Sequence, residues 1–211
     1  EICYSSNPDY TNVPDDNFEQ ALIDLGYDDT LDDFVLTASI SGVEDLNVGE
    51  KEISDLTGIE DFTALTHLQC RANQLTSLDV SSNTALTSLN CDINAIPSLE
   101  VSNNTALTYI NCRANQLTSL DLSSNTALTT LICDFNELTS LDVSTNTALT
   151  TLKCDYNELT ALDLSANTAL DYLQCGENQL TSLDVSANTA LTELYCQNNQ
   201  LTSLDVSSNT A

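Results

Sequence analysis

Residues 107–127 read LTYINCRANQLTSLDLSSNTA, and residues 128–148 read LTTLICDFNELTSLDVSTNTA. The two stretches are successive copies of one 21-residue unit, L-T-x-L-x-C-x-x-N-x-L-T-S-L-D-V-S-x-N-T-A. Seven such copies follow one another from Leu65 to Ala211 without insertion or deletion. Seven of the eight cysteines therefore recur at the same position of the unit, at Cys70, Cys91, Cys112, Cys133, Cys154, Cys175 and Cys196. Because a repeat of fixed length is the signature of a stacked array, the chain is predicted to be a solenoid.

The apolar positions of each unit show which side chains face the core. Leu68 and Cys70 alternate with outward residues, which is the period-2 pattern of a short strand. Leu75, Leu78 and Val80 complete the inward set. One coil cannot enclose these side chains, but coils stacked about 4.8 Å apart bury them as columns. The run L-x-x-L-x-C-x-x-N-x-L predicts a leucine-rich repeat solenoid, an α/β-class horseshoe made mostly of short parallel strands and turns.

The column of cysteines is predicted to be a ladder of reduced, buried thiols. Each coil supplies one thiol and no histidine faces inward, so a metal site, which needs several converging ligands, is not expected. Disulfides between coils need Cβ atoms about 3.8 Å apart, closer than a coil spacing of about 4.8 Å allows. A free Cys packs as a small apolar group. Cys3 lies outside the column, and the sequence leaves the state of its thiol open.

Two polar columns also run through the array. An asparagine at the ninth position of each unit is predicted to donate to and accept from backbone groups of adjacent coils; these residues are Asn73, Asn94, Asn115, Asn136, Asn157, Asn178 and Asn199. An acid occupies the fifteenth position, at Asp79, Glu100, Asp121, Asp142, Asp163, Asp184 and Asp205. We expect each of these carboxylates to accept from a backbone N–H two residues on. Calcium bridging between neighbouring acids is the alternative, and no other cofactor is expected.

The segment before the repeats, 1–64, differs from them in kind. Residues 1–45 are predicted to be a leader with a small helical N-terminal cap, 46–64 a degenerate first repeat, and 65–211 the seven regular repeats. Pro14, the acids after it, the apolar residues from Phe18 to Leu25 and then Gly26 indicate a short amphipathic helix that covers the end of the core. The acids of the segment 28–33 lack the glycine and terminal glutamate of an EF-hand loop, so we expect a solvated surface cluster there.

Composition excludes several classes of function. The 211 residues carry 32 acids and 4 bases, a net charge of −28, which rules out general nucleic-acid binding because phosphate recognition needs clustered Lys or Arg. No apolar run approaches the roughly 20 residues of a membrane span, so no membrane insertion is expected. The charge favours a soluble monomer. The absence of Met and the end on a repeat boundary suggest that a signal peptide has been removed and that the protein is longer.

Variation within the repeats is confined to a few positions, which predict the functional site. The third, fifth, seventh and eighth positions differ from copy to copy, and we expect them to project from the strand side, the concave face. They hold three of the four bases, the only histidine and every aromatic ring after Phe62. Exposed rings and Arg are typical of binding hot spots, although neutral drift of outward positions is the alternative. The predicted ligand-binding residues are His67, Arg71, Tyr109, Arg113, Ile132, Phe135, Lys153, Tyr156, Tyr172 and Tyr195.

No catalytic residues are predicted. His67 has no fixed nucleophile or orienting acid beside it, and no Gly-rich phosphate loop exists. With acids this frequent, pairs of carboxylates arise by accident and are not evidence for a glycosidase.

The unit L-T-x-L-x-C-x-x-N-x-L-T-S-L-D-V-S-x-N-T-A resembles the 21-residue, cysteine-ladder repeats of the internalin family. The stretch I-S-D-L-T-G-I-E-D-F-T-A-L at 53–65 is similar to internalin-type repeats more broadly. The resemblance implies a bacterial protein, secreted or anchored at the cell surface. It implies an adhesion module that binds a host or environmental surface protein, glycoprotein or polysaccharide. Two alternatives stay open: a rigid acidic spacer, and a calcium-stabilised surface-layer component without its own ligand.

Overall fold

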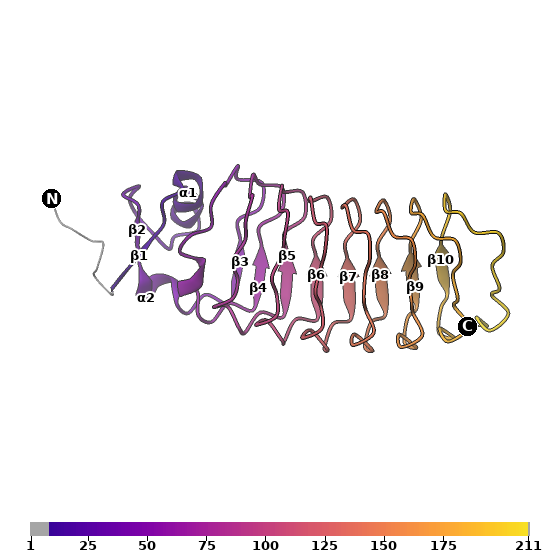
Figure 1. The fold of residues 1–211 in the computed structure, drawn as a ribbon. Coiled ribbons are helices and arrows are strands. Elements are labelled where there is room, and N and C mark those ends of the chain that lie inside the picture. The colour runs from indigo at the N-terminus through magenta and orange to yellow at the C-terminus, as the bar shows by residue number, and fades with distance from the viewer. Residues whose placement is uncertain (1–8, 211) are drawn as a thin grey trace.

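The computed structural model describes residues 9–210 and shows an elongated solenoid with a small cap at its N-terminal end (Figure 1). Eight short parallel strands form one sheet along the long axis, in chain order from β3 to β10. The strands are β3 (Asp45–Asn47), β4 (His67–Gln69), β5 (Ser88–Asn90), β6 (Tyr109–Asn111), β7 (Thr130–Ile132), β8 (Thr151–Lys153), β9 (Tyr172–Gln174) and β10 (Glu193–Tyr195). The leucine-rich repeat fold expected from the sequence is confirmed.

The register of the sheet places like repeat positions beside one another. Leu68 of β4 pairs with Leu89 of β5, which pairs in turn with Ile110 of β6, and the same shift of one repeat unit continues to β10. The first step, from Leu46 to Leu68, is slightly longer than the later ones. Columns of identical side chains therefore follow from the constant coil length, as the repeat predicts.

The core is one continuous cluster that runs from the cap through the coils. The leucines of each unit are buried along most of the array, and so are the cysteine side chains from Cys70 to Cys175. All seven cysteines of the column are free thiols, which confirms the reduced ladder. Their Sγ atoms can donate to a carbonyl of the next coil, as Cys133 does to the Lys153 carbonyl oxygen at 3.4 Å.

Two ladders of buried asparagine connect the coils. The predicted ladder is confirmed: Asn136 Nδ2 donates to the carbonyls of Cys112 and Cys133, both at 3.1 Å, and its Oδ1 accepts from the Leu117 N–H at 3.0 Å. The sequence pattern did not predict the second ladder. It uses the asparagine of the N-T-A segment, such as Asn146, whose Nδ2 donates to the carbonyls of Leu122 and Asn125 of the preceding coil. The turns lack the backbone–backbone hydrogen bonds of a helix or sheet, so the amide side chains of both ladders pair with their backbone groups instead.

The eighth position of every unit has a left-handed backbone, which the sequence did not reveal. The φ values of these residues lie between 50° and 55°; they are Ala72, Ile93, Ala114, Phe135, Tyr156, Glu177 and Asn198. Asn and Gly adopt this conformation most readily, whereas a side chain such as that of Ile is strained there. Recurrence in all seven copies makes the turn a property of the repeat, whatever residue fills it.

The cap packs on the first coil, at the N-terminal end of the core. It contains β1 (Tyr10–Asn12), α1 (Asp16–Asp24), β2 (Phe34–Leu36) and α2 (Thr37–Ile40), followed by β3 and the 3-10 helix η1 (Ile59–Asp61). The expected helix is present: Asp15 caps its N-terminus, and Gly26 follows it with φ 82°. β1 and β2 pair antiparallel.

The Phe18 ring on α1 stacks against Phe62 of the first coil, with centroids 6.4 Å apart. The helix thus closes the apolar end of the array, as expected. We propose 1–45, 46–64 and 65–211 as the boundaries of cap, first repeat and regular array.

Candidate functional site

Within residues 113–198, the variable positions bring rings and charges together on the strands and in the turns that follow them. Phe135 and Tyr156, both at the left-handed eighth position, stack with ring centroids 4.2 Å apart and an interplanar angle of 11°. The Arg113 guanidinium lies 4.8 Å from the Phe135 centroid, which is cation–π distance. Phe135 and Tyr156 are 41% and 48% exposed, so much of the stack is available to a partner. We call these three residues the upper stack.

A second group of rings lies on the last strands. Tyr172 of β9 and Tyr195 of β10 approach with ring centroids 5.8 Å apart and planes tilted by 41°. The Lys153 ammonium on β8 lies 5.0 Å from the Tyr172 centroid. Ile132 is the strand partner of Lys153, so it borders the group. We call Lys153, Tyr172 and Tyr195 the strand group.

Two carboxyl groups lie close enough to these cations to interact with them electrostatically. Asp134 and Asp155 occupy the seventh position of adjacent units and are only 6% and 9% exposed. Asp134 Oδ1 accepts from the Asp155 N–H at 3.2 Å, and Asp155 Oδ1 accepts from the Gly176 N–H. Burial, together with the charge of Asp155, raises the pKa of Asp134 to about 6, while Lys153 and Arg113 act in the opposite direction. Burial also raises the pKa of Asp155.

The expectation that every seventh position projects outward is therefore wrong for part of the column. Arg71 is exposed and Arg113 half-buried, but Asp134, Asp155 and Gly176 are buried. A turn begins at the seventh position. The carboxylates of Asp134 and Asp155 are buried there because each accepts a hydrogen bond from a backbone N–H of the next coil. Together with the upper stack and the strand group, Asp134 and Asp155 make up what we call the strand-face site.

The remaining predicted residues lie toward the N-terminal end of the sheet. His67 is exposed, and its Nδ1 bonds the Thr66 hydroxyl at 2.9 Å. The Arg71 guanidinium pairs with Glu50 at 3.0 Å and lies 3.8 Å from Asp92. Tyr109 is half-buried on β6. These residues share the sheet with the strand-face site, but no ring or ion-pair contact between them and the upper stack is found among residues 9–210.

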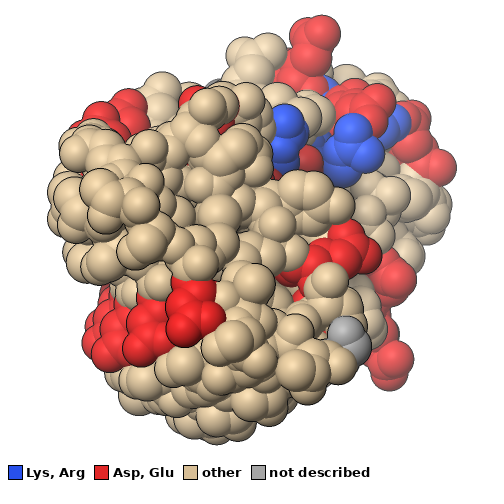
Figure 2. Space-filling view, turned by 90° about the vertical axis from the view of Figure 1, so that its right-hand side faces the viewer, with Lys and Arg blue, Asp and Glu red and all other residues tan. Residues whose placement is uncertain are grey.

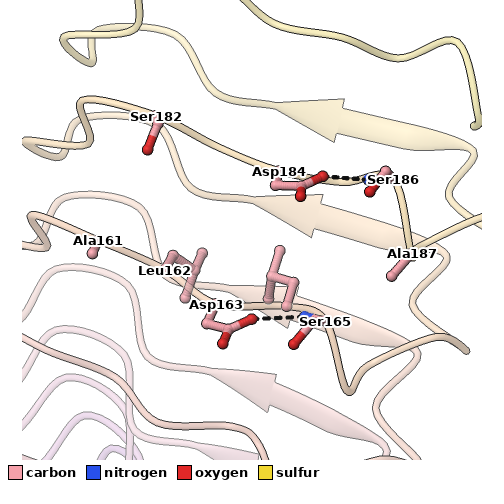
Figure 3. Close-up of a pocket in the computed structure, with 9 residues that line it drawn as sticks. Ala161, Leu162, Asp163, Ser165, Ser182, Asp184, Ser186 and Ala187 are labelled. Carbon is pink, nitrogen blue, oxygen red and sulfur yellow. Dashed lines mark hydrogen bonds between the residues drawn. The ribbon is translucent and has the colours of Figure 1, made fainter.

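The acid column has the local bonds expected from sequence. Asp163 Oδ1 accepts from the Ser165 N–H, and Asp184 Oδ1 from the Ser186 N–H, each at 2.9 Å (Figure 3). These bonds hold the pKa of each carboxyl, Asp163 and Asp184, below its usual value. A hollow of about 290 Å³ lies between these two coils, with Leu162 among its lining residues.

Hollows of the same kind recur beside Asp79 and Asp205. They are therefore a product of coil spacing and are not specific to one repeat. In the end-on view of Figure 2, acidic side chains form a row along one edge, whereas Lys and Arg gather on another side of the molecule.

The described residues offer few groups for catalysis or metal binding within the array. The buried thiols are poor nucleophiles because burial raises their pKa, to about 12 for Cys91 and Cys175. Over residues 9–210, three metal-ligating side chains converge within 4.8 Å at a single place, in the cap and away from the acid column. No described helix is long and apolar enough to cross a membrane.

Parallel coils, a buried thiol column and a match of residues 168–209 to the leucine-rich repeat family model (two copies) define the class. The chain therefore has a leucine-rich repeat fold with a cysteine ladder. It is similar to internalin J of Listeria monocytogenes serotype 4b, with 40% identity over 70 residues. It also resembles the solved functional domain of InlJ from Listeria monocytogenes, described as including a cysteine ladder, with 38% identity and a TM-score of 0.75.

The share of each chain that is aligned limits the conclusions that these matches support. The InlJ structure is matched over 95% of this chain, and the chain covers 50% of the InlJ chain. The 70 matched residues are 33% of this chain and 8% of internalin J. Internalin C2 of the same species, at 20% identity with a TM-score of 0.84 over 97% of this chain and 94% of its own, shares the fold. The likeness to InlJ supports a protein-binding or adhesion-type module in general.

Proposed function

We propose that this chain is a non-enzymatic extracellular module that recognises a protein or glycan ligand through the strand-face site. The observation that carries the proposal is the upper stack: Arg113, Phe135 and Tyr156 form an ordered, exposed layer of cation and rings. Similarity to internalin J further supports a bacterial protein that is secreted or held at the cell surface. Its partner would be a host or environmental surface protein, glycoprotein or polysaccharide.

The backbone under the upper stack strengthens the proposal. Phe135 and Tyr156 have φ of 54° and 52°, a region where Asn or Gly would be less strained. The turn does not require rings at this position, because Asn198 occupies the same position at φ 55°. Exposed rings at a strained position favour a role in recognition over a role in folding.

The charges of the strand-face site suit a ligand with both apolar and polar groups. Rings offer flat surfaces on which sugar rings or protein side chains pack, and Arg113 and Lys153 can pair with carboxylate or sulfate groups. Both cations lie within a protein of net charge −28, so an extended polyanion would be repelled outside this patch. We therefore expect a ligand with localised negative charge.

The test is a screen of glycans, mucins and surface proteins with the whole chain. The wild type is compared with the double variant Tyr156→Ala, Tyr172→Ala, which removes one ring from each group. Ser182→Ala, an exposed substitution beside the acid column, is the matched control. Binding by the wild type and the control, with loss in the double variant, supports the proposal.

A ligand bound equally by all three proteins would contradict recognition through the strand-face site. If no probe is captured, the chain is better described as a rigid acidic spacer. Charge reversal of Lys153 should then be tolerated without a change in the stability of the fold.

A further inference from the structure

We propose that the N-terminal cap binds one calcium ion between α1 and the loop 28–33, with Asp16, Glu19 and Asp33 as carboxylate ligands. One oxygen from each of these side chains lies within 4.8 Å of the other two. Asp16 and Glu19 stand on the first turns of α1, and Asp33 directly precedes β2. These segments lie together at the cap end of the solenoid (Figure 1).

Glu19 shows that the cluster is more than a set of solvated acids. The Glu19 side chain is fully buried, whereas Asp29, Asp32 and Asp33 of the neighbouring segment 28–33 are exposed, as expected from the sequence. Its Oε1 accepts from the N–H groups of Asp32 at 2.9 Å and Phe34 at 3.1 Å. Its Oε2 is equally inaccessible to solvent and has no hydrogen-bond partner. A desolvated, unpaired carboxylate oxygen is costly, and a cation bound to it removes that cost.

A neighbouring acid adds to the uncompensated charge. Asp28 Oδ2 is also buried without a partner. Burial, together with the negative charge of Asp28, raises the pKa of Glu19. The ion pairs found over residues 9–210 join Lys51 to Asp24 and Arg71 to Glu50 and Asp92, so no base neutralises this cluster. The cap thus concentrates negative charge around one desolvated oxygen.

The chemistry of the donors selects calcium. All donors are carboxylate oxygens, which suit hard cations and not zinc or copper. Calcium accepts six to eight oxygens at about 2.3–2.6 Å, so ligands on opposite sides of the ion lie up to about 5 Å apart. The spacing within the cluster fits that range. Asp15 is not available as a ligand, because its oxygens cap α1 and bind Ser54 and Asp55.

The ion would join two parts of the cap that cover the core. α1 packs on the first coil through Phe18 and Phe62, and the loop 28–33 leads into β2. A bound ion would hold α1 to that loop. Because the ion binds the folded cap and not the unfolded chain, calcium must raise the unfolding midpoint by mass action.

The experiment uses the whole chain, stripped with a chelator and titrated with calcium chloride by calorimetry. Asp16→Asn and Asp33→Asn are suitable variants, since both side chains are exposed and Asn tolerates the φ of 70° at residue 33. Asp121→Asn in the acid column is the matched control. We expect one ion per wild-type chain, an affinity at least about tenfold weaker in each cap variant, and no change in the control.

A second variant separates ion binding from loss of fold. Glu19→Gln retains an oxygen for the Asp32 and Phe34 N–H groups but removes the buried charge. It should abolish calcium binding while leaving the calcium-free midpoint equal to or above that of the wild type. The proposal is overturned if the wild type gives neither binding heat nor a midpoint shift at millimolar calcium. It is equally overturned if Asp121→Asn weakens binding and the cap variants do not.

Discussion

The rings of Phe135 and Tyr156 stack with centroids 4.2 Å apart, although they belong to successive units of the repeat. The contact exists because both residues occupy the eighth position of units of equal length. Coils of constant length place like positions next to each other, so an exposed ring in two successive units becomes one continuous surface. Recognition residues can therefore change from coil to coil while the leucine, cysteine and asparagine columns hold the fold.

The buried amide ladder should make a large contribution to stability. Asn136→Ala removes the donors to Cys112 and Cys133 and the acceptor for the Leu117 N–H, leaving buried backbone groups unpaired. We expect the free energy of unfolding to fall by about 2–4 kcal/mol in urea denaturation. The exposed Asn103→Ala is the matched control and should change it by less than about 0.5 kcal/mol. Equal effects of the two substitutions would refute a structural role for the ladder.

The thiol ladder should be protected from alkylation in the folded chain. The side chains from Cys70 to Cys175 are buried and their pKa values are raised by burial, whereas Cys196 is half-buried. Iodoacetamide at about pH 8 should label Cys196 well before the others, and all thiols should react in denaturant. Peptide mass spectrometry measures the order. Early labelling of Cys112 in the native protein would show that the core is not closed as described.

Asp134 should make stability depend on pH between about 4 and 6. Its pKa rises from 3.8 to about 6 in the folded chain, so the folded state holds more protons in this window and stability falls as pH rises through it. Asp134→Asn keeps an oxygen for the Asp155 N–H. It should be more stable than the wild type at about pH 7.5 by about 1–2 kcal/mol, with a flatter profile above about pH 4.

Thermal unfolding across pH measures this difference, with the exposed Asp45→Asn as control. The carboxyls of the acid column act in a different pH window. Because their pKa values are lowered in the folded chain, they stabilise the fold at neutral pH, and that contribution is lost only as pH falls below about 4. A wild-type profile that rises across the window of Asp134 and matches that of Asp134→Asn would contradict the assignment.

The left-handed turn predicts a stabilising substitution. Ile93 is β-branched, has φ of 55° and is 43% exposed, so it is strained without being part of the core. Ile93→Asn should raise the free energy of unfolding by about 1 kcal/mol, because Asn adopts this conformation more readily. Ala114→Asn at the equivalent turn should have a smaller effect, since Ala has no branched side chain. Destabilisation by Ile93→Asn would mean that this side chain packs against the coils.

The sequence predicted the columns but not the details that depend on turns. Constant spacing of Leu68, Cys70 and their copies was enough to predict strands, core and ladder, since stacking converts period into position. The left-handed φ at Phe135 could not be predicted, because neither Phe nor Ile signals that conformation. Burial of Asp134 depends on an N–H group of the next coil, and burial of Glu19 on the loop that folds over α1. Sequence periodicity reports none of these longer-range contacts.

The central claim is that strand-face side chains serve recognition while inward columns serve the fold. It is tested most directly by measuring the thermal midpoint and ligand affinity of two variants in parallel: Tyr156→Ala with Tyr172→Ala, and Asn136→Ala. We predict that the ring variant loses affinity at least about tenfold while its midpoint stays within about 2 °C of the wild type. The asparagine variant should melt several degrees lower yet bind normally while folded. A ring variant that melts much lower and still binds as tightly as the wild type would contradict the claim.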